Sequence, residues 1–123
     1  MSLDITPKVP AGRQLVTAYG DGGFRITGQG FDGSVLVFLG ETQSWSGNLS
    51  IEGLAPVIEA ADTVDILVVG CGPEFTLPPE DLRQALRAHG IVLEWMDTAA
   101  ACRTYNVLAI EERSVAAALV AVV

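Results

Sequence analysis

Four polar or reactive side chains interrupt a helix-like segment near the end of this 123-residue chain. The segment from Met96 to Ile110 contains three consecutive alanines, and its apolar residues recur at spacings of three and four, which predicts a helix with a buried face. Within it stand Cys102, Arg103, Thr104 and Asn106. Because polar groups are costly to bury without partners, we expect these side chains to form either a binding site or structural hydrogen bonds.

A second group of candidate residues follows two predicted strands. Val64 to Val69 is mostly aliphatic, as in a strand that is buried on both faces, and it ends in Gly70-Cys71-Gly72-Pro73. The strand from Val92 to Met96 ends in Asp97-Thr98, either of which would cap the following helix. If these strands are parallel neighbours, both loops lie at the sheet edge where α/β proteins bind ligands.

These segments predict a binding site for a small molecule, and in particular for an anion. Glycines let a ligand approach the backbone, and the first turn of the helix would offer free N–H groups to an anion. The alternative interpretation is structural: Arg103 pairs with a carboxylate, Asn106 links backbone segments, and the glycine loop is only a turn. The candidate ligand-binding residues are Gly70, Cys71, Gly72, Asp97, Thr98, Arg103 and Asn106.

Catalytic constellations are poorly represented. The single histidine, His89, stands at a predicted helix end, where a cation is favourable, and we expect it to have a structural role. Because the chain has no other histidine, none remains to act as a base for Cys71. The segment Gly28–Gly33 matches the dinucleotide pattern G-x-G-x-x-G, but a strand follows it instead of a helix, and we interpret Asp32-Gly33 as a hairpin turn. We therefore predict no cofactor and no metal site, and we favour a non-enzymatic function.

The composition excludes several classes of partner. Fifteen acidic and seven basic residues give a net charge of −8, and the basic residues are scattered, so we expect no binding to nucleic acid. The chain has no apolar segment long enough to span a bilayer and no signal-peptide pattern, which predicts a cytoplasmic protein without membrane insertion. Cys71 and Cys102 lack metal-ligand spacing, and we interpret them as free thiols in a reducing compartment.

The N-terminal half is expected to begin with an arm and a hairpin. Two prolines and a glycine in residues 1–14 indicate a flexible arm, and we assign residues 15–123 to a single α/β domain. Phe24–Thr27 alternates between apolar and polar residues, and Ser34–Leu39 is a more continuous apolar strand. These two strands predict an antiparallel hairpin.

The second half is expected to alternate between strands and helices. A short helix over Leu54–Ala61 precedes this half. The next helix has acidic residues in its first turn and ends at His89-Gly90, and the last helix runs from Thr98 to about Glu112. The valines near Val123 suit a final strand. The predicted fold is therefore a mixed sheet in which the N-terminal hairpin is followed by β-α-β-α-β with right-handed crossovers.

Several of these segments resemble one family. It is the domain-of-unknown-function family that includes the mitochondrial NADH dehydrogenase (complex I) assembly factor 3. The similarity covers about Tyr19 to Val122, and its most specific block is Asp97–Leu108. This chain departs from the family at Cys71, where threonine is more usual, and at Glu112, where glycine is expected. The supporting segments are Tyr19–Ile26, Gly33–Val35, Val64–Gly72, Leu82–Leu86, Gly90-Ile91 and Val115–Leu119.

The resemblance implies a compact α/β domain with a mixed sheet and no established cofactor or catalytic residue. It implies protein partners, namely the subunits or other assembly factors of a membrane complex. We therefore predict a non-enzymatic interaction or assembly module. The alternative hypothesis is a small-molecule-binding domain or enzyme with its site at the strand ends. A third hypothesis is a homo-oligomer whose surface carries the function.

Overall fold

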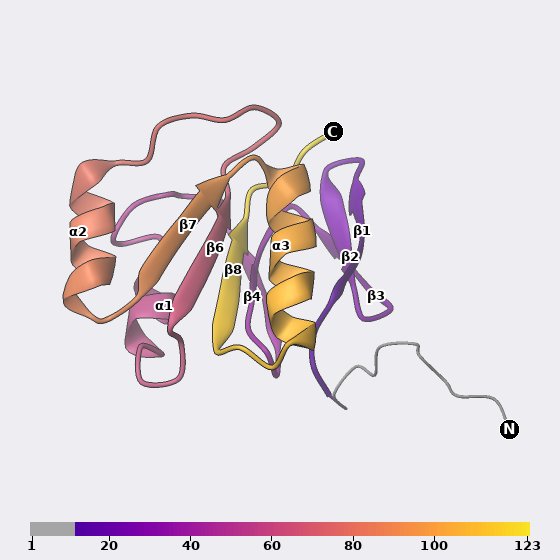
Figure 1. Ribbon diagram of the computed structural model, residues 1–123. Helices are drawn as coiled ribbons and strands as arrows, with labels where there is room; N and C mark the ends of the chain where they lie inside the picture. Colours follow the sequence, from indigo (N-terminus) through magenta and orange to yellow (C-terminus); the bar gives the residue numbers. More distant parts are fainter. Residues whose placement is uncertain (1–11) are drawn as a thin grey trace, which may run out of the picture.

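The described residues of this computed structural model, residues 12–123, form two sheets and three helices (Figure 1). The first sheet is antiparallel and consists of β1 (Val16–Gly20), β2 (Gly23–Ile26) and β3 (Gln29–Asp32). The predicted arm over residues 1–14 falls mainly on residues 1–11, which lie outside the described part of the chain. From Gln14 onward the chain is bonded to the body of the protein, because the Gln14 N–H donates to the Leu39 carbonyl at 2.9 Å.

The second sheet has five strands in the order β5-β4-β8-β6-β7. Strand β6 is parallel to both β7 and β8, whereas β4 is antiparallel to β8 and β5, so the sheet is mixed as predicted. Its elements are β4 (Ser34–Val37), β5 (Thr42–Trp45), β6 (Ile66–Gly70), β7 (Val92–Met96) and β8 (Val115–Leu119), with helices α1 (Ala55–Glu59), α2 (Glu80–Ala88) and α3 (Thr98–Ile110).

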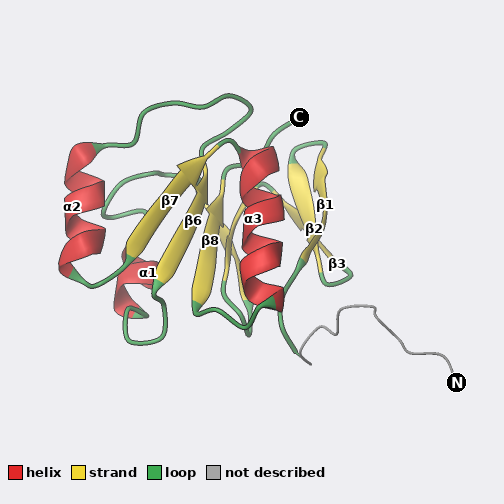
Figure 2. Ribbon diagram, in the orientation of Figure 1, coloured by secondary structure: helices red, strands yellow, loops and turns green. Residues whose placement is uncertain are grey.

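The five-stranded sheet is the middle layer of the protein (Figure 2). Helix α3 and the small sheet cover one face, where Tyr105 and Ile26 are fully buried against Val68. Helices α1 and α2 cover the other face, where Leu82 and Leu86 pack into a second apolar cluster. Burial on both faces explains why the strands read as continuous apolar runs rather than as alternating ones.

Strand β8 lies at the centre of this sheet although three of its five residues are alanines. Ala116, Ala117 and Ala118 are completely buried between β4 and β6. Alanine is a poor strand former in isolation, but at this position pairing on both sides outweighs its intrinsic preference. The predicted final strand is confirmed, but it ends at Leu119, before the valines that suggested it.

The turn predicted at Asp32-Gly33 is wrong. The chain turns instead at Thr27-Gly28, where both residues have positive φ (46° and 85°), the backbone of a tight hairpin turn. Gln29–Asp32 then pairs with β2 as a strand, and Gly33 redirects the chain into the larger sheet. Helix α3 also ends earlier than expected, at Ile110, because Glu112 has a φ of 63° that a helix cannot continue.

Candidate functional site

The structure brings five of the predicted site residues together at the carboxyl ends of β6 and β7. The two strands are parallel neighbours, with Gly70 beside Met96, so the loops that follow them meet at this edge. Gly70 lies directly against the start of α3: a Cβ on Gly70 would stand 2.8 Å from the Thr98 Cα. Only glycine permits this close approach of strand and helix. The five residues are Gly70, Cys71, Gly72, Asp97 and Thr98.

Thr98 joins three chain segments at this point and is fully buried. Its hydroxyl donates to the Val120 carbonyl at 2.8 Å and accepts from the Gly72 N–H at 3.0 Å. Its own N–H donates to the Gly72 carbonyl at 2.9 Å. The hydroxyl therefore uses both its donor and its acceptor capacity on the backbone of this chain.

The first turn of α3 is capped by Asp97, as predicted. The Asp97 carboxylate accepts a hydrogen bond from the Ala100 N–H at 2.9 Å, and the Asp97 carbonyl accepts from the Ala101 N–H. With the Thr98 N–H also bonded, three N–H groups of this helix start already have protein partners. An anion at this position would have to displace the cap.

Arg103 and Asn106 do not lie at the strand ends. They project from the middle of α3 toward β1, where the Asn106 side chain bonds the backbone of Val16 twice. Its amide oxygen accepts from the Val16 N–H at 2.9 Å, and its amide nitrogen donates to the Val16 carbonyl at 2.8 Å. Asn106 therefore links two backbone segments, which is the structural interpretation drawn from the sequence.

Arg103 lines a cleft of about 290 Å³ between α3 and β1, together with Tyr19 and Cys102. Arg103 is exposed, and Tyr19 is 44% exposed. Burial raises the pKa of the Cys102 thiol to about 12, although the nearby Arg103 charge partly opposes this. Cys102 is therefore protonated at neutral pH and is a poor nucleophile. The cleft thus offers a cation and a phenol, but no reactive thiolate.

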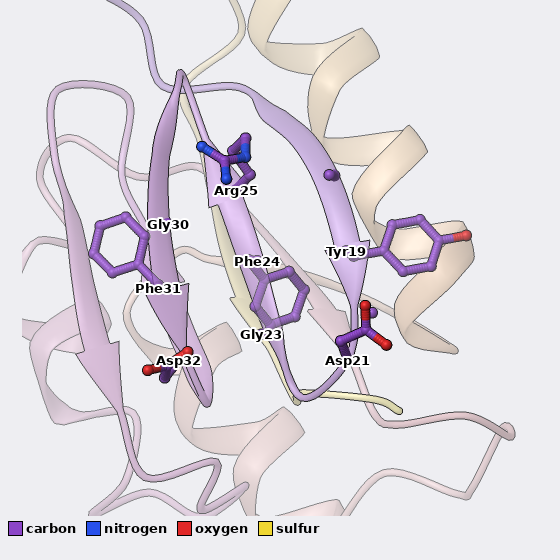
Figure 3. Close-up of a pocket in the computed structure, with 10 residues that line it drawn as sticks. Tyr19, Asp21, Gly23, Phe24, Arg25, Gly30, Phe31 and Asp32 are labelled. Atoms are coloured by element: carbon purple, nitrogen blue, oxygen red, sulfur yellow. The ribbon is translucent and has the colours of Figure 1, made fainter.

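An open groove of about 300 Å³ lies on the three-stranded sheet (Figure 3). Tyr19, Phe24 and Phe31 are cross-strand neighbours in register, and they form a row across the three strands. Arg25 lies on β2, where its Nη1 donates to the Gly28 carbonyl at 3.1 Å. Asp21 and Asp32 lie toward the other end of the groove (Figure 3). Phe24 is only 5% exposed and belongs to the apolar core, so the aromatic row lies on the face of the small sheet that packs against the rest of the protein. Arg25 and Asp32 alternate with these rings along their strands and give the open face both signs of charge.

The loop between β6 and α2, residues 71–79, presents two large apolar side chains to solvent. Phe75 is 58% exposed and Leu77 is 84% exposed. Between them, the Thr76 carbonyl accepts a hydrogen bond from the Trp95 indole nitrogen at 2.6 Å. At the start of the loop, the Cys71 thiol donates to the Glu74 carbonyl at 3.4 Å. The loop is therefore tied to the sheet while its apolar side chains point away from the core.

Sequence reasoning missed both the groove and this loop. The groove was hidden because the sequence predicts a hairpin turn at Asp32-Gly33 and gives no sign that Gln29–Asp32 is a strand. The loop carried a usable signal: Phe75 and Leu77 are apolar residues between prolines, in a segment without helical or strand periodicity. Such residues have no core face to join and must be exposed unless the loop folds back.

Two classes of feature are absent from residues 12–123. No group of three or more histidine, cysteine or acidic side chains is placed to hold a metal ion within this range. Within the same range, none of the helices combines the length and apolarity needed to cross a membrane. Both cysteines are free: Cys71 is partly exposed and Cys102 is buried.

Comparison with known proteins gives consistent matches over almost the whole chain. A family model described as "Protein of unknown function (DUF498/DUF598)" matches residues 16–120. An uncharacterised protein of Rhodobacter capsulatus is 38% identical over 117 residues, which cover 94% of this chain and 92% of that protein.

Two further matches connect the chain to a named protein and to an experimental structure. NADH dehydrogenase [ubiquinone] 1 alpha subcomplex assembly factor 3 of Danio rerio is 28% identical over 123 residues, covering 97% of this chain and 71% of that protein. A crystal structure of a Bartonella henselae protein, described as an outer membrane protein, superposes with a TM-score of 0.86 at 36% identity. It covers 91% of this chain and 98% of that one.

Proposed function

This chain belongs to the DUF498/DUF598 family of proteins of unknown function, and on that premise we propose that it is a protein-interaction module that assists the assembly of an NADH dehydrogenase complex. The relatives that carry a functional name are NADH dehydrogenase assembly factors. An assembly factor acts by binding subunits, so its function requires a surface that recognises another protein rather than a catalytic centre.

The observation that carries this proposal is the loop of residues 71–79. Large apolar side chains that are held in solvent lose the free energy that burial would supply, about 1.5–3 kcal/mol each. Phe75 and Leu77 are held there by an ordered backbone, because Trp95 fixes the carbonyl of the residue between them. Exposed apolar side chains on a rigid support are typical of protein-binding surfaces, since little entropy is lost on binding.

The decisive experiment replaces both side chains in the source organism. A strain that lacks the protein is complemented with the wild-type chain or with Phe75→Ser/Leu77→Ser, and assembled NADH dehydrogenase is quantified on native gels. We expect the double variant to restore much less assembled complex than the wild type. Because both side chains are exposed, the purified variant should keep the wild-type melting temperature.

A matched control separates loss of a binding surface from loss of apolar surface in general. Val107 on α3 is 54% exposed, and Val107→Ser should complement like the wild type. The assembly proposal fails if the deletion strain contains a normal amount of complex. The role assigned to this loop fails if Phe75→Ser/Leu77→Ser complements fully.

A second candidate function is the binding of a small anion in the cleft between α3 and β1. The observation that favours it is Arg103, an exposed cation at the rim of this cleft whose guanidinium forms no ion pair with another described residue. Inorganic phosphate is a suitable first probe. Arg103→Ala should abolish phosphate binding in calorimetry without changing the melting temperature, and a variant that unfolds would show instead that Arg103 is structural.

A further inference from the structure

The edge of the larger sheet carries a surface that is complementary to itself. Strand β7 is the last strand of the sheet and, among residues 12–123, pairs only with β6. Helix α2 packs beside it (Figure 1). A shallow groove of about 250 Å³ between α2 and the start of β7 is lined by Arg83, Arg87 and residues 90–93. Of the two ends of the sheet, this edge lies on the side away from the small sheet, which contacts β4 (Figure 1).

The charges of α2 are arranged by sign along its length. Glu80 and Asp81 occupy its first turn, and Arg83 and Arg87 follow. Glu80, Gln84 and Arg87 are exposed, and their spacing of four and three places them on one face of the helix. The helix is therefore neutral, with two acids and two arginines, whereas the whole chain carries a net charge of −8.

From this arrangement we propose that two copies of the chain associate through α2 and β7 about a two-fold axis. A two-fold interface brings the same surface of both copies together in opposite directions, so the surface must complement itself. With the axis at Gln84, the acidic start of each α2 lies beside Arg87 of the other copy. Two chains of charge −8 repel each other in general, and the balanced charge of α2 reduces this repulsion on the face where the copies meet.

The strand supplies the second half of the contact. Alternate residues of β7 bond to β6: the Val92 N–H donates to the Asp65 carbonyl, and the Met96 carbonyl accepts from the Cys71 N–H. Leu93 and Trp95, which alternate with them, direct their backbone N–H and C=O groups away from β6. These outward groups are the ones that an added antiparallel strand would pair with.

The charge of Glu94 selects the register of this pairing. A two-fold axis at Glu94 would set the two Glu94 side chains directly opposite each other, which is unfavourable. An axis at Leu93 instead pairs Leu93 with its own copy and sets Val92 opposite Glu94 of the other copy. Val92 is 56% exposed in the single chain, and this register covers it. The two five-stranded sheets then join into one continuous sheet.

The test uses the full chain and two charge variants in sedimentation equilibrium. The wild-type chain should double in mass as its concentration rises. Arg83→Glu/Arg87→Glu makes α2 entirely acidic, and Glu80→Arg/Asp81→Arg makes it entirely basic. Each variant should raise the dissociation constant at least about tenfold, because every substitution acts twice in a two-fold dimer. An equimolar mixture of the two variants should dimerise again.

Two further measurements keep the outcome specific. Arg103→Glu/Arg113→Glu makes the same change in net charge on exposed residues elsewhere, and it should dimerise like the wild type. In the dimer, the backbone amides of Leu93 and Trp95 should be protected from hydrogen exchange. A wild-type chain that stays monomeric at every concentration overturns the proposal, as do charge variants that dimerise normally or Leu93 and Trp95 amides that exchange freely in the dimer.

Discussion

At the scale of single residues, the polar side chains of α3 divide between structure and surface. Asn106 forms its hydrogen bonds with the backbone of β1. Thr98 forms its hydrogen bonds with the backbone that follows β6 and β8. Arg103 stays exposed beside the cleft between α3 and β1. The helix sequence alone could not assign these roles, because the partner of Asn106 lies 90 positions earlier in the chain.

Asn106→Ala should destabilise the protein by about 2–3 kcal/mol, because it removes two hydrogen bonds and leaves the Val16 backbone without its partners. Urea denaturation would measure this loss. Arg103→Ala, one turn away on the same helix, is the matched control and should change the free energy of unfolding by no more than about 0.5 kcal/mol. Equal stability of the two variants would contradict the structural role of Asn106.

Stability should fall at alkaline pH through Cys102. Burial raises the thiol pKa from 9.0 to about 12, so the folded state favours the protonated thiol. The contribution of the protonated thiol to the free energy of unfolding is complete below pH 9. It is lost as the pH rises toward 12, at up to about 1.4 kcal/mol per pH unit. Burial raises the pKa of the Tyr105 phenol in the same direction. Denaturation curves from pH 8 upward should therefore show a shallower decline for Cys102→Ala than for the wild type.

At the scale of elements, the strongest sequence patterns were the most informative. β6, α2, β7 and α3 were all predicted, because long apolar runs, acidic first turns and the Asp97 cap each have a local cause. β3 was missed because its pairing with β2 is decided by a turn at Thr27, a residue that seldom adopts positive φ. The candidate site was predicted only in part: its strand-end residues meet, but Arg103 and Asn106 lie on another side of α3.

The packing of β6 against α3 depends on Gly70. Gly70→Ala should destabilise the protein by about 1–3 kcal/mol, since the new Cβ would stand 2.8 Å from the Thr98 Cα and the helix would have to move. Thermal denaturation of this variant is best compared with Gly30→Ala, because the space beside Gly30 is open. A Gly70→Ala variant as stable as Gly30→Ala would show that the helix start moves without cost.

At the scale of the whole molecule, β8 holds the two halves of the fold together. It pairs with β4 from the N-terminal half on one side and with β6 from the alternating half on the other. A chain that ends at Ser114 should therefore be unfolded by circular dichroism, while a peptide of residues 115–123 added in excess should recover part of the helical signal. A folded chain without β8 would contradict this dependence.

The position of β8 also bears on how the protein is made. β4 leaves the ribosome some eighty residues before its central neighbour, because β4 begins at Ser34 and β8 at Val115. During that interval β4 and β6 each expose an unpaired strand edge, and the nascent chain cannot close its sheet until β8 has been synthesised. Closure of the sheet during synthesis therefore waits for β8, and the edges left open until then are the kind of surface that chaperones of nascent polypeptides shield.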